Sequence, residues 1–194
     1  MTTALFIGRF QPFHCGHLKA LEYILKKKAL VILMLGSAQE SNTWDNPFSA
    51  RERIQMISAV LTRAGLADKV TLVPVIDIGD NKLWVSHVKM HVPAFDCVYS
   101  NNPLVQKLFR EAGYAVFDTS SFDRGRFEGV KIRALIAESR SWEERVPQEV
   151  AAYLKLCGGD VKIKRLKQTP GKEEAKLTPC KCKKRSDFPK SLSR

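Results

Sequence analysis

The sequence of 194 residues contains no apolar run long enough to cross a bilayer, and no basic, signal-like segment precedes its first apolar run. Its five cysteines are odd in number and scattered, which is typical of reduced thiols rather than of a disulfide framework. Cys180 and Cys182 supply only two of the four ligands that a structural zinc ion needs. These features predict a cytoplasmic protein with no membrane partner and no metal bound by protein side chains.

Two widespread nucleotide-binding motifs are also missing, namely the G-x-G-x-x-G fingerprint and a glycine-rich loop ending in G-K-[ST]. In their place, residues 8–17 read Gly-Arg-Phe-Gln-Pro-Phe-His-Cys-Gly-His, between an apolar run at 4–7 and a helical pattern at 18–25. This position is the loop from a first strand to a first helix, where α/β proteins bind ligands. His14 and His17 are three residues apart and share one helix face. Together with the helix N-terminus they predict a phosphate site.

This stretch resembles the H-x-G-H signature of the nucleotidyltransferase superfamily, and its longer form resembles the archaeal-type nicotinamide-nucleotide adenylyltransferases. Residues 129–133, Gly-Val-Lys-Ile-Arg, are similar to the second signature of that family, Gly-Thr-x-Ile-Arg. Val130 stands where the family usually has threonine, so one hydroxyl donor is missing. Asp45 stands in a loop where some relatives carry a basic residue. The competing interpretation is that the histidines are ordinary helix-start residues and that Arg133 is a surface arginine.

Apolar runs at 29–35, 70–76, 95–99 and 114–117 alternate with helical patterns, the last of them at 142–155. This alternation predicts an α/β fold: a doubly wound, Rossmann-like parallel five-stranded sheet with helices on both faces, followed by C-terminal helices. Pro74 predicts an edge strand or a bulge. Of the net charge of +12, residues 160–194 carry +8, from 12 Lys and Arg against 4 Asp and Glu. We therefore expect a nucleotidyltransferase domain over 1–165 and a basic, disordered tail over 166–194.

The resemblance implies transfer of an adenylyl group from ATP to nicotinamide mononucleotide (NMN), which gives NAD and pyrophosphate. It implies Mg²⁺ carried on the triphosphate and a homo-oligomer, often a hexamer among relatives. The implied catalytic residues are His14, His17 and Arg133. The implied ATP site comprises Gly8, Arg9, Phe10, His14, Gly16, His17, Arg124, Gly129, Val130, Ile132 and Arg133. The implied NMN site comprises Gly36, Ser37, Asp77, Trp84 and Asn101.

Several alternatives remain open at this stage. The acceptor could be flavin mononucleotide, phosphopantetheine or a cytidylyl acceptor, and Trp84 could belong to the core. The basic tail could bind nucleic acid, although its only aromatic residue is Phe188, which disfavours base stacking. A catalytically inactive sensor or scaffold is disfavoured by the intact signatures. Arg51 and Arg53 lie in the first turn of a helix, where a cation is disfavoured, so each is either solvent-facing or offset by an anion.

Overall fold

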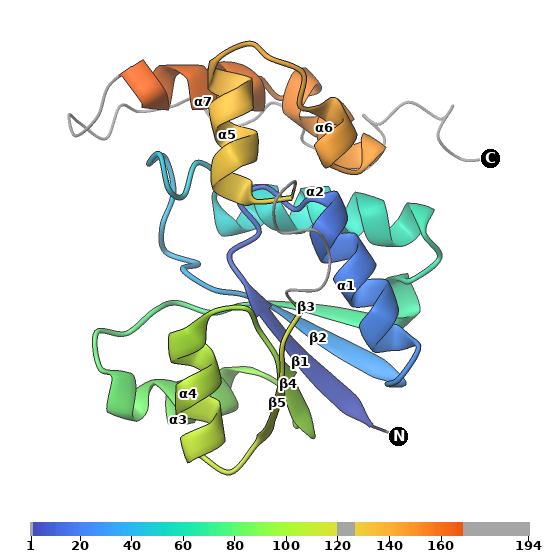
Figure 1. Ribbon diagram of the computed structural model, residues 1–194, viewed down its shortest axis with the longest axis vertical. Helices are drawn as coiled ribbons and strands as arrows, with labels where there is room; N and C mark the ends of the chain where they lie inside the picture. Colours follow the sequence, from blue (N-terminus) through green and yellow to red (C-terminus); the bar gives the residue numbers. More distant parts are fainter. Residues whose placement is uncertain (1, 120–126, 169–194) are drawn as a thin grey trace.

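A computed structural model describes residues 2–119 and 127–168 of the chain (Figure 1). Its five strands form one parallel sheet in the order β3-β2-β1-β4-β5. The strands are β1 (Thr3–Gly8), β2 (Leu30–Leu35), β3 (Val70–Pro74), β4 (Cys97–Tyr99) and β5 (Ala115–Phe117). The predicted parallel five-stranded sheet is confirmed. Pro74 ends β3, which is an edge strand, as its missing N–H donor requires.

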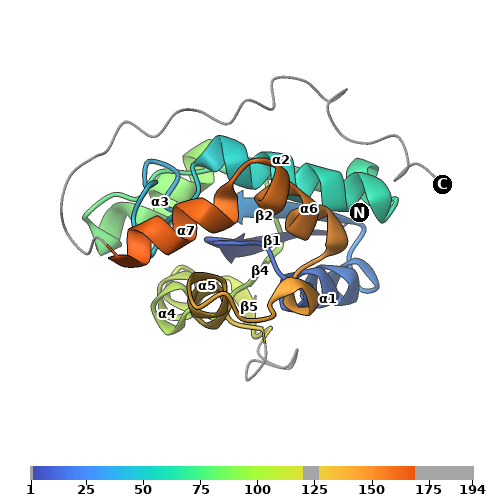
Figure 2. The same cartoon turned by 90° about the horizontal axis from the view of Figure 1, so that it is seen from above.

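The helices that cover the sheet lie on both of its faces (Figures 1 and 2). They are α1 (Cys15–Leu25), α2 (Ala50–Arg63), α3 (Asn81–His91) and α4 (Pro103–Glu111). Alternate residues of β1 enter two separate hydrophobic clusters: Ala4 and Phe6 pack with α1 and α2, whereas Leu5 and Ile7 pack with α3 and α4. A strand buried on both faces reads as a continuous apolar run, which is why β1 was recognisable in the sequence.

Helix starts follow the local sequence closely. Ser49 caps α2, and its side chain and that of Glu52 form the predicted reciprocal capping box. Asn102 caps α4 by accepting from the N–H groups of Leu104 and Val105, with Pro103 at the first helical position. Because each of these helices follows a strand of the parallel sheet, its N-terminus lies toward the edge at which the strands end.

The C-terminal part differs from the prediction in two respects. The helix predicted over 142–155 was wrong at its start: a short 3₁₀ turn (Glu143–Arg145) comes first, and α6 (Gln148–Leu156) begins only after Pro147. A further helix, α7 (Gly159–Gln168), was not predicted. Together with α5 (Gly129–Ala137), α6 and α7 form a group beyond one end of the sheet (Figures 1 and 2).

Helix α7 is attached to the domain by packing and by charge. Ile163 is fully buried in the same cluster as α1 and α2. The ammonium of Lys162 lies 3.2 Å from the carboxylate of Glu52, the residue that completes the cap of α2. The predicted domain boundary at 165 falls inside this helix, so residues 166–168 of the predicted tail are helical, and the rest of that tail, residues 169–194, lies outside the described residues. None of the helices in the described part of the chain is long and apolar enough to cross a membrane.

Candidate nucleotide-binding site

A cavity of about 740 Å³ opens at the carboxyl edge of the sheet. Residues that follow all five strands line it, including Arg9 after β1, Ser37 after β2, Asp77 after β3, Asn101 after β4 and Thr119 after β5. The strand order reverses at β1, which pairs with β2 on one side and β4 on the other. Open α/β sheets bind ligands at this switch point, so the cavity lies where the fold predicts a nucleotide site.

The first turn of α1 is capped by its two histidines. His14 is the N-cap residue, and its Nδ1 accepts from the backbone N–H of His17 at 3.3 Å. The backbone N–H of His14 in turn donates to Nδ1 of His17, also at 3.3 Å. The rings stack with centroids 3.5 Å apart and planes 15° from parallel. This is a capping box in which both side chains are imidazoles.

The cap assigns the tautomer of both rings. Because each Nδ1 accepts a hydrogen bond, each neutral ring carries its proton on Nε2. Burial lowers the pKa of His14 from 6.5 to about 3, even though a backbone hydrogen bond raises it. Burial also lowers the pKa of His17 well below 6.5, and the charge of a protonated His14 would lower it further. Both rings line the cavity, so near neutral pH it receives two uncharged N–H donors.

Tight packing explains the glycines of this region. A Cβ on Gly16 would lie 2.9 Å from Cβ of Phe127 and 3.2 Å from Nδ1 of His14. A Cβ on Gly8 would lie 2.8 Å from the ring of Phe10. The space beside both glycines is therefore filled by protein side chains. Both glycines nonetheless line the cavity with their backbone.

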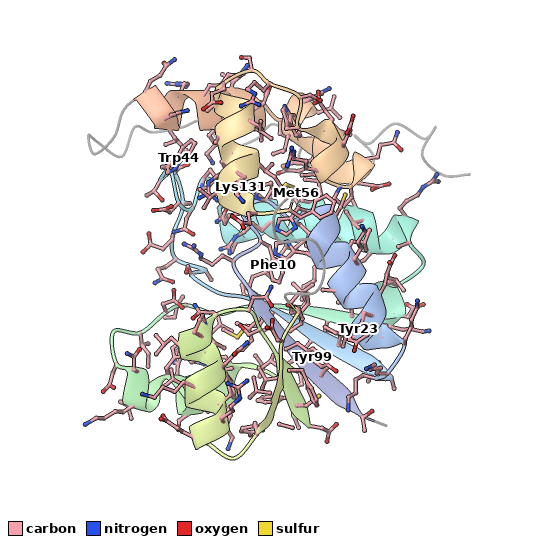
Figure 3. All side chains as sticks on the ribbon, in the orientation of Figure 1. Phe10, Tyr23, Trp44, Met56, Tyr99 and Lys131 are labelled. Atoms are coloured by element: carbon pink, nitrogen blue, oxygen red, sulfur yellow. The ribbon has the colours of Figure 1, made fainter. Side chains whose placement is uncertain are left out.

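Two residues predicted for the ATP site have side chains in the core. The ring of Phe10 lies at the centre of the molecule (Figure 3), edge-on to Phe6 and His17. Ile132 is also fully buried. Neither side chain lines the cavity, so within the described residues they support its walls from behind. Arg124, a further predicted ATP ligand, lies outside the described residues.

The second signature forms the start of α5, as predicted. Gly129 begins the helix and lets it approach the first loop closely, since a Cβ there would lie 2.9 Å from the carbonyl oxygen of Gln11. Val130 follows it, lines the cavity and is 51% exposed. The N-terminus of α5 therefore presents backbone N–H groups on the same cavity as the histidine pair.

Arg133, the last residue of that signature, is buried rather than at the surface. Its Nη1 donates to the carbonyl oxygen of Gln11 at 2.8 Å, and its Nη2 lies 3.4 Å from the carboxylate of Asp45. Its guanidinium carbon lies 5.6 Å from the ring centre of Trp44, in the loop before α2 (Figure 3). Burial lowers its pKa to about 10, and Asp45 opposes that shift. Nε of Arg133 is buried with no hydrogen-bond partner among the described residues.

Residues predicted for the NMN site line the same cavity. The hydroxyl of Ser37 donates to the carboxylate of Asp77 at 2.6 Å, and Gly36 and Asn101 line the cavity as well. Trp84 on α3 also lines the cavity, and it packs edge-on against Phe109 with ring centres 5.7 Å apart. Trp84 therefore belongs both to the cavity wall and to the core, which were the two alternatives left open by the sequence.

One residue of the site was not recognised from the sequence. Arg53 on α2 is fully buried, so its solvent-facing interpretation was wrong. It donates to the backbone carbonyl oxygens of four residues, Arg9 (2.8 Å), Gly36 (2.8 Å), Ser37 (3.0 Å) and Ser49 (3.4 Å). Burial lowers its pKa to about 10, while the negative charge of Asp77 raises it. Asp77 thus supplies the anion that offsets this cation, whereas Arg51 is exposed.

The described residues contain no group of three or more His, Cys, Asp or Glu side chains that could hold a metal ion. Two imidazoles and a helix N-terminus on a cavity after the central strand of an all-parallel sheet are the arrangement expected of an α/β nucleotide-binding protein. Within that class, a family model described as cytidylyltransferase-like matches residues 5–155.

Curated relatives narrow this class. A nicotinamide-nucleotide adenylyltransferase of Archaeoglobus fulgidus is 43% identical over 174 residues, which is 88% of this chain and 98% of that protein. One of Thermococcus onnurineus is 43% identical over 162 residues, 84% of this chain and 87% of that protein. This chain belongs to the nicotinamide-nucleotide adenylyltransferase family.

A solved structure supports the fold. The bifunctional NMN adenylyltransferase/ADP ribose pyrophosphatase from Francisella tularensis, determined with AMP and a manganese ion, superposes with a TM-score of 0.63 at 22% identity. The match covers 89% of this chain and 57% of that protein, so this chain spans little more than half of its length. At this identity the likeness concerns the fold alone.

The histidine cap predicts a pH dependence of stability that His14→Asn should reduce. Unfolded His14 takes up a proton below pH 6.5, but in the folded protein it does so only near pH 3. The unfolded state therefore binds more protons in this window, and stability falls as the pH falls, by up to about 1.4 kcal/mol per pH unit for one histidine. The amide oxygen of asparagine can replace Nδ1 in the cap but does not titrate.

Urea unfolding followed by circular dichroism between pH 6.5 and pH 4 should show a shallower loss of stability in His14→Asn than in the wild type. His91→Asn, which changes an exposed histidine on α3, is the matched control. Parallel curves for His14→Asn and the wild type would contradict the assignment of a buried, neutral His14.

Proposed function

We propose that this cavity binds ATP and NMN together and transfers the adenylyl group between them, giving NAD and pyrophosphate. In this reaction a phosphate oxygen of NMN forms a bond to the α-phosphorus of ATP. The bond from that phosphorus to the oxygen bridging the α- and β-phosphates breaks, and pyrophosphate leaves. The observation that carries the proposal is the pair of neutral Nε2–H donors at the start of α1. Family membership supports the choice of substrates.

In this proposal, His14 and His17 donate hydrogen bonds to the α- and β-phosphates. Negative charge on the phosphate oxygens rearranges as the bond to the α-phosphorus breaks, and fixed donors stabilise that charge without reorganising. The stacked rings and their backbone caps hold both donors in place before the substrates arrive. Catalysis then consists of positioning and of charge stabilisation.

The start of α5 receives the departing pyrophosphate in this proposal. Its N–H groups at Gly129 and Val130 supply donors, and the helix dipole favours an anion there. The exposed side chain of Arg9, which lines the cavity, adds a positive charge. Arg133 acts here through its charge and by bracing the first loop at Gln11. A direct contact between Arg133 and pyrophosphate, and a role for Arg124, stay predictions.

The acceptor occupies the opposite end of the cavity. Its pyridinium ring is cationic and stacks on Trp84, because the face of an indole attracts a cation. Ser37, Asp77 and Asn101 supply polar groups around it, and the backbone at Gly36 completes that wall. The two substrates thus meet above the carboxyl end of β1, where the strand order reverses.

Three further elements complete the proposal. A divalent metal ion accompanies the reaction, and we assign it as Mg²⁺ held by the triphosphate oxygens and water, which suits a cavity without a carboxylate cluster among the described residues. The manganese ion of the Francisella structure supports divalent metal use. We also propose that the chain works in the cytoplasm as a homo-oligomer, a form that among relatives is often a hexamer.

The acceptor assignment predicts a selective effect of Trp84→Phe. With the wild-type protein, adenylyl transfer is measured with NMN, flavin mononucleotide and phosphopantetheine as acceptors, and NMN should turn over fastest.

In the Trp84→Phe variant, phenylalanine retains an apolar ring beside Phe109 but attracts cations less strongly than tryptophan. The Michaelis constant for NMN should rise severalfold, with the constant for ATP and the melting temperature little changed. Faster turnover of another acceptor, or equal rises for both substrates, would overturn the assignment.

The assigned role of the histidines predicts the effect of His17→Ala. Loss of one preorganised donor should lower turnover by roughly 10²–10³. The Michaelis constant for ATP should change much less, because the donor acts mainly in the transition state. Steady-state kinetics of the folded variant and the wild type give both constants. A rise in that Michaelis constant with turnover intact would show that His17 contributes only to substrate binding.

Val130 offers a test of the pyrophosphate end. Because Val130 is exposed at the first turn of α5, Val130→Thr should place a hydroxyl on the cavity without disturbing the core. One added hydrogen bond should tighten ATP binding by about 1 kcal/mol, which calorimetry can detect. Val161→Thr changes an equally exposed valine on α7 and serves as the control. Unchanged or weaker ATP binding in Val130→Thr would place the triphosphate elsewhere.

A further inference from the structure

Two non-glycine residues in the loops of the cavity adopt the left-handed backbone conformation that normally favours glycine. Phe10, in the loop after β1, has φ of 52°, and Ser37, in the loop after β2, has φ of 49°. L-residues avoid this region because Cβ approaches the following carbonyl oxygen. Such conformations persist only where surrounding contacts impose them, and they concentrate at functional sites.

The guanidinium of Arg53 holds the peptide groups beside both residues. Its Nη1 donates to the carbonyl oxygen of Arg9, which belongs to the peptide bond entering Phe10. The same nitrogen donates to the carbonyl oxygen of Gly36, and Nη2 donates to that of Ser37. These two oxygens belong to the peptide bonds on either side of Ser37. One buried side chain therefore restrains both left-handed residues.

The two loops serve different substrates in the proposed function. The loop after β1 leads to the donors of His14 and His17 on the triphosphate side. The loop after β2 presents Ser37, whose hydroxyl donates to Asp77 on the acceptor side. Because Arg53 lies beneath both loops, a shift of its guanidinium would move the ATP end and the acceptor end relative to each other.

We propose that Arg53 is a positioning residue that sets the relative placement of the two substrates by holding both cavity loops on one guanidinium group. The proposal rests on the proposed function, since the reaction joins one atom of each substrate. The rate of such a reaction depends steeply on the alignment of the two reacting atoms. Arginine suits this role because its planar fork can bond several carbonyl oxygens in fixed directions, whereas the ammonium of lysine is a point charge.

The first test is Arg53→Lys, which keeps the positive charge facing Asp77 but loses the planar fork. Turnover of ATP and NMN should fall by about 10²-fold, the scale expected for a misalignment of roughly 1 Å. The Michaelis constants for both substrates should stay within about threefold, because each loop alone can still bind its own substrate. Arg51→Lys changes an exposed arginine of the same turn and should leave all three constants unchanged.

If Arg53 only stabilises the fold, a different result is expected. It would lower the melting temperature and the fraction of active protein, whereas turnover per active site, determined by titration of sites, would stay at the wild-type value. That result, or a loss confined to the Michaelis constants, would overturn the proposal. If Arg53→Lys does not fold, the same measurements on Arg53→Gln, with its planar amide, decide the question.

A second test uses the left-handed conformation itself. Ser37→Gly removes the need for restraint, because glycine adopts this conformation at no steric cost, but it also loses the hydroxyl bond to Asp77. Measured beside the wild type, this variant gives the combined effect of the lost hydroxyl and the relaxed backbone while Arg53 is intact. When Ser37→Gly is added to Arg53→Lys, it should lower the turnover number by less than it does in the wild type, or should raise it. If the effects of the two substitutions on turnover simply multiply in the double variant, Arg53 does not restrain Ser37.

The outcomes separate this proposal from the proposed function. If the wild-type chain forms no NAD from ATP and NMN, the proposed substrates are wrong, and the same variants are measured with the acceptor that the panel identifies. If the wild type forms NAD and Arg53→Lys retains its turnover, the positioning role alone fails.

Discussion

The reciprocal hydrogen bonds between His14 and His17 are the interaction on which the site depends. A helix start usually satisfies its first N–H groups with hydroxyl or carboxylate oxygens. Here the Nδ1 atoms of two imidazoles do so, and the rings stack at 3.5 Å as a consequence. The stack requires that Gly16 carry no side chain, because a Cβ there would collide with Phe127 and crowd the ring of His14. A change in either ring would therefore disturb the helix start and the cavity wall together.

The sequence predicted those features whose causes are local. Apolar runs identified the five strands. The signal is strongest for β1, β2 and β4, which are buried on both faces over most of their length and therefore need apolar residues at nearly every position. Ser49 with Glu52, and Asn102 with Pro103, marked two helix starts correctly. Helix α7 was not predicted because it has few large apolar residues and because its burial depends on packing against α5 and α6. Ile163 is its one fully buried side chain, and that burial is apparent only in the folded chain.

The burial of Arg53 and Arg133 could not be predicted from the neighbouring sequence. Arg53 bonds to carbonyl oxygens 44, 17 and 16 positions earlier in the chain, and Arg133 bonds to one 122 positions earlier. No pattern around either residue distinguishes a cation that clamps distant loops from one that faces solvent. The motif around Arg133 predicted that it lies near the cavity, but not that Gln11 and Asp45 already engage its guanidinium. Burial of charge is a property of the assembled fold.

The histidine cap also limits the chemistry that the cavity can perform. A general base must accept a proton, yet each ring already carries one on Nε2 and uses Nδ1 to hold the backbone. Protonation at Nδ1 would break the start of α1, and burial opposes the resulting charge. Neither ring can therefore activate a hydroxyl group by taking its proton. The cavity suits nucleophiles that arrive already ionised, as phosphate monoesters do at neutral pH, and alcohols would find no proton acceptor in this pair.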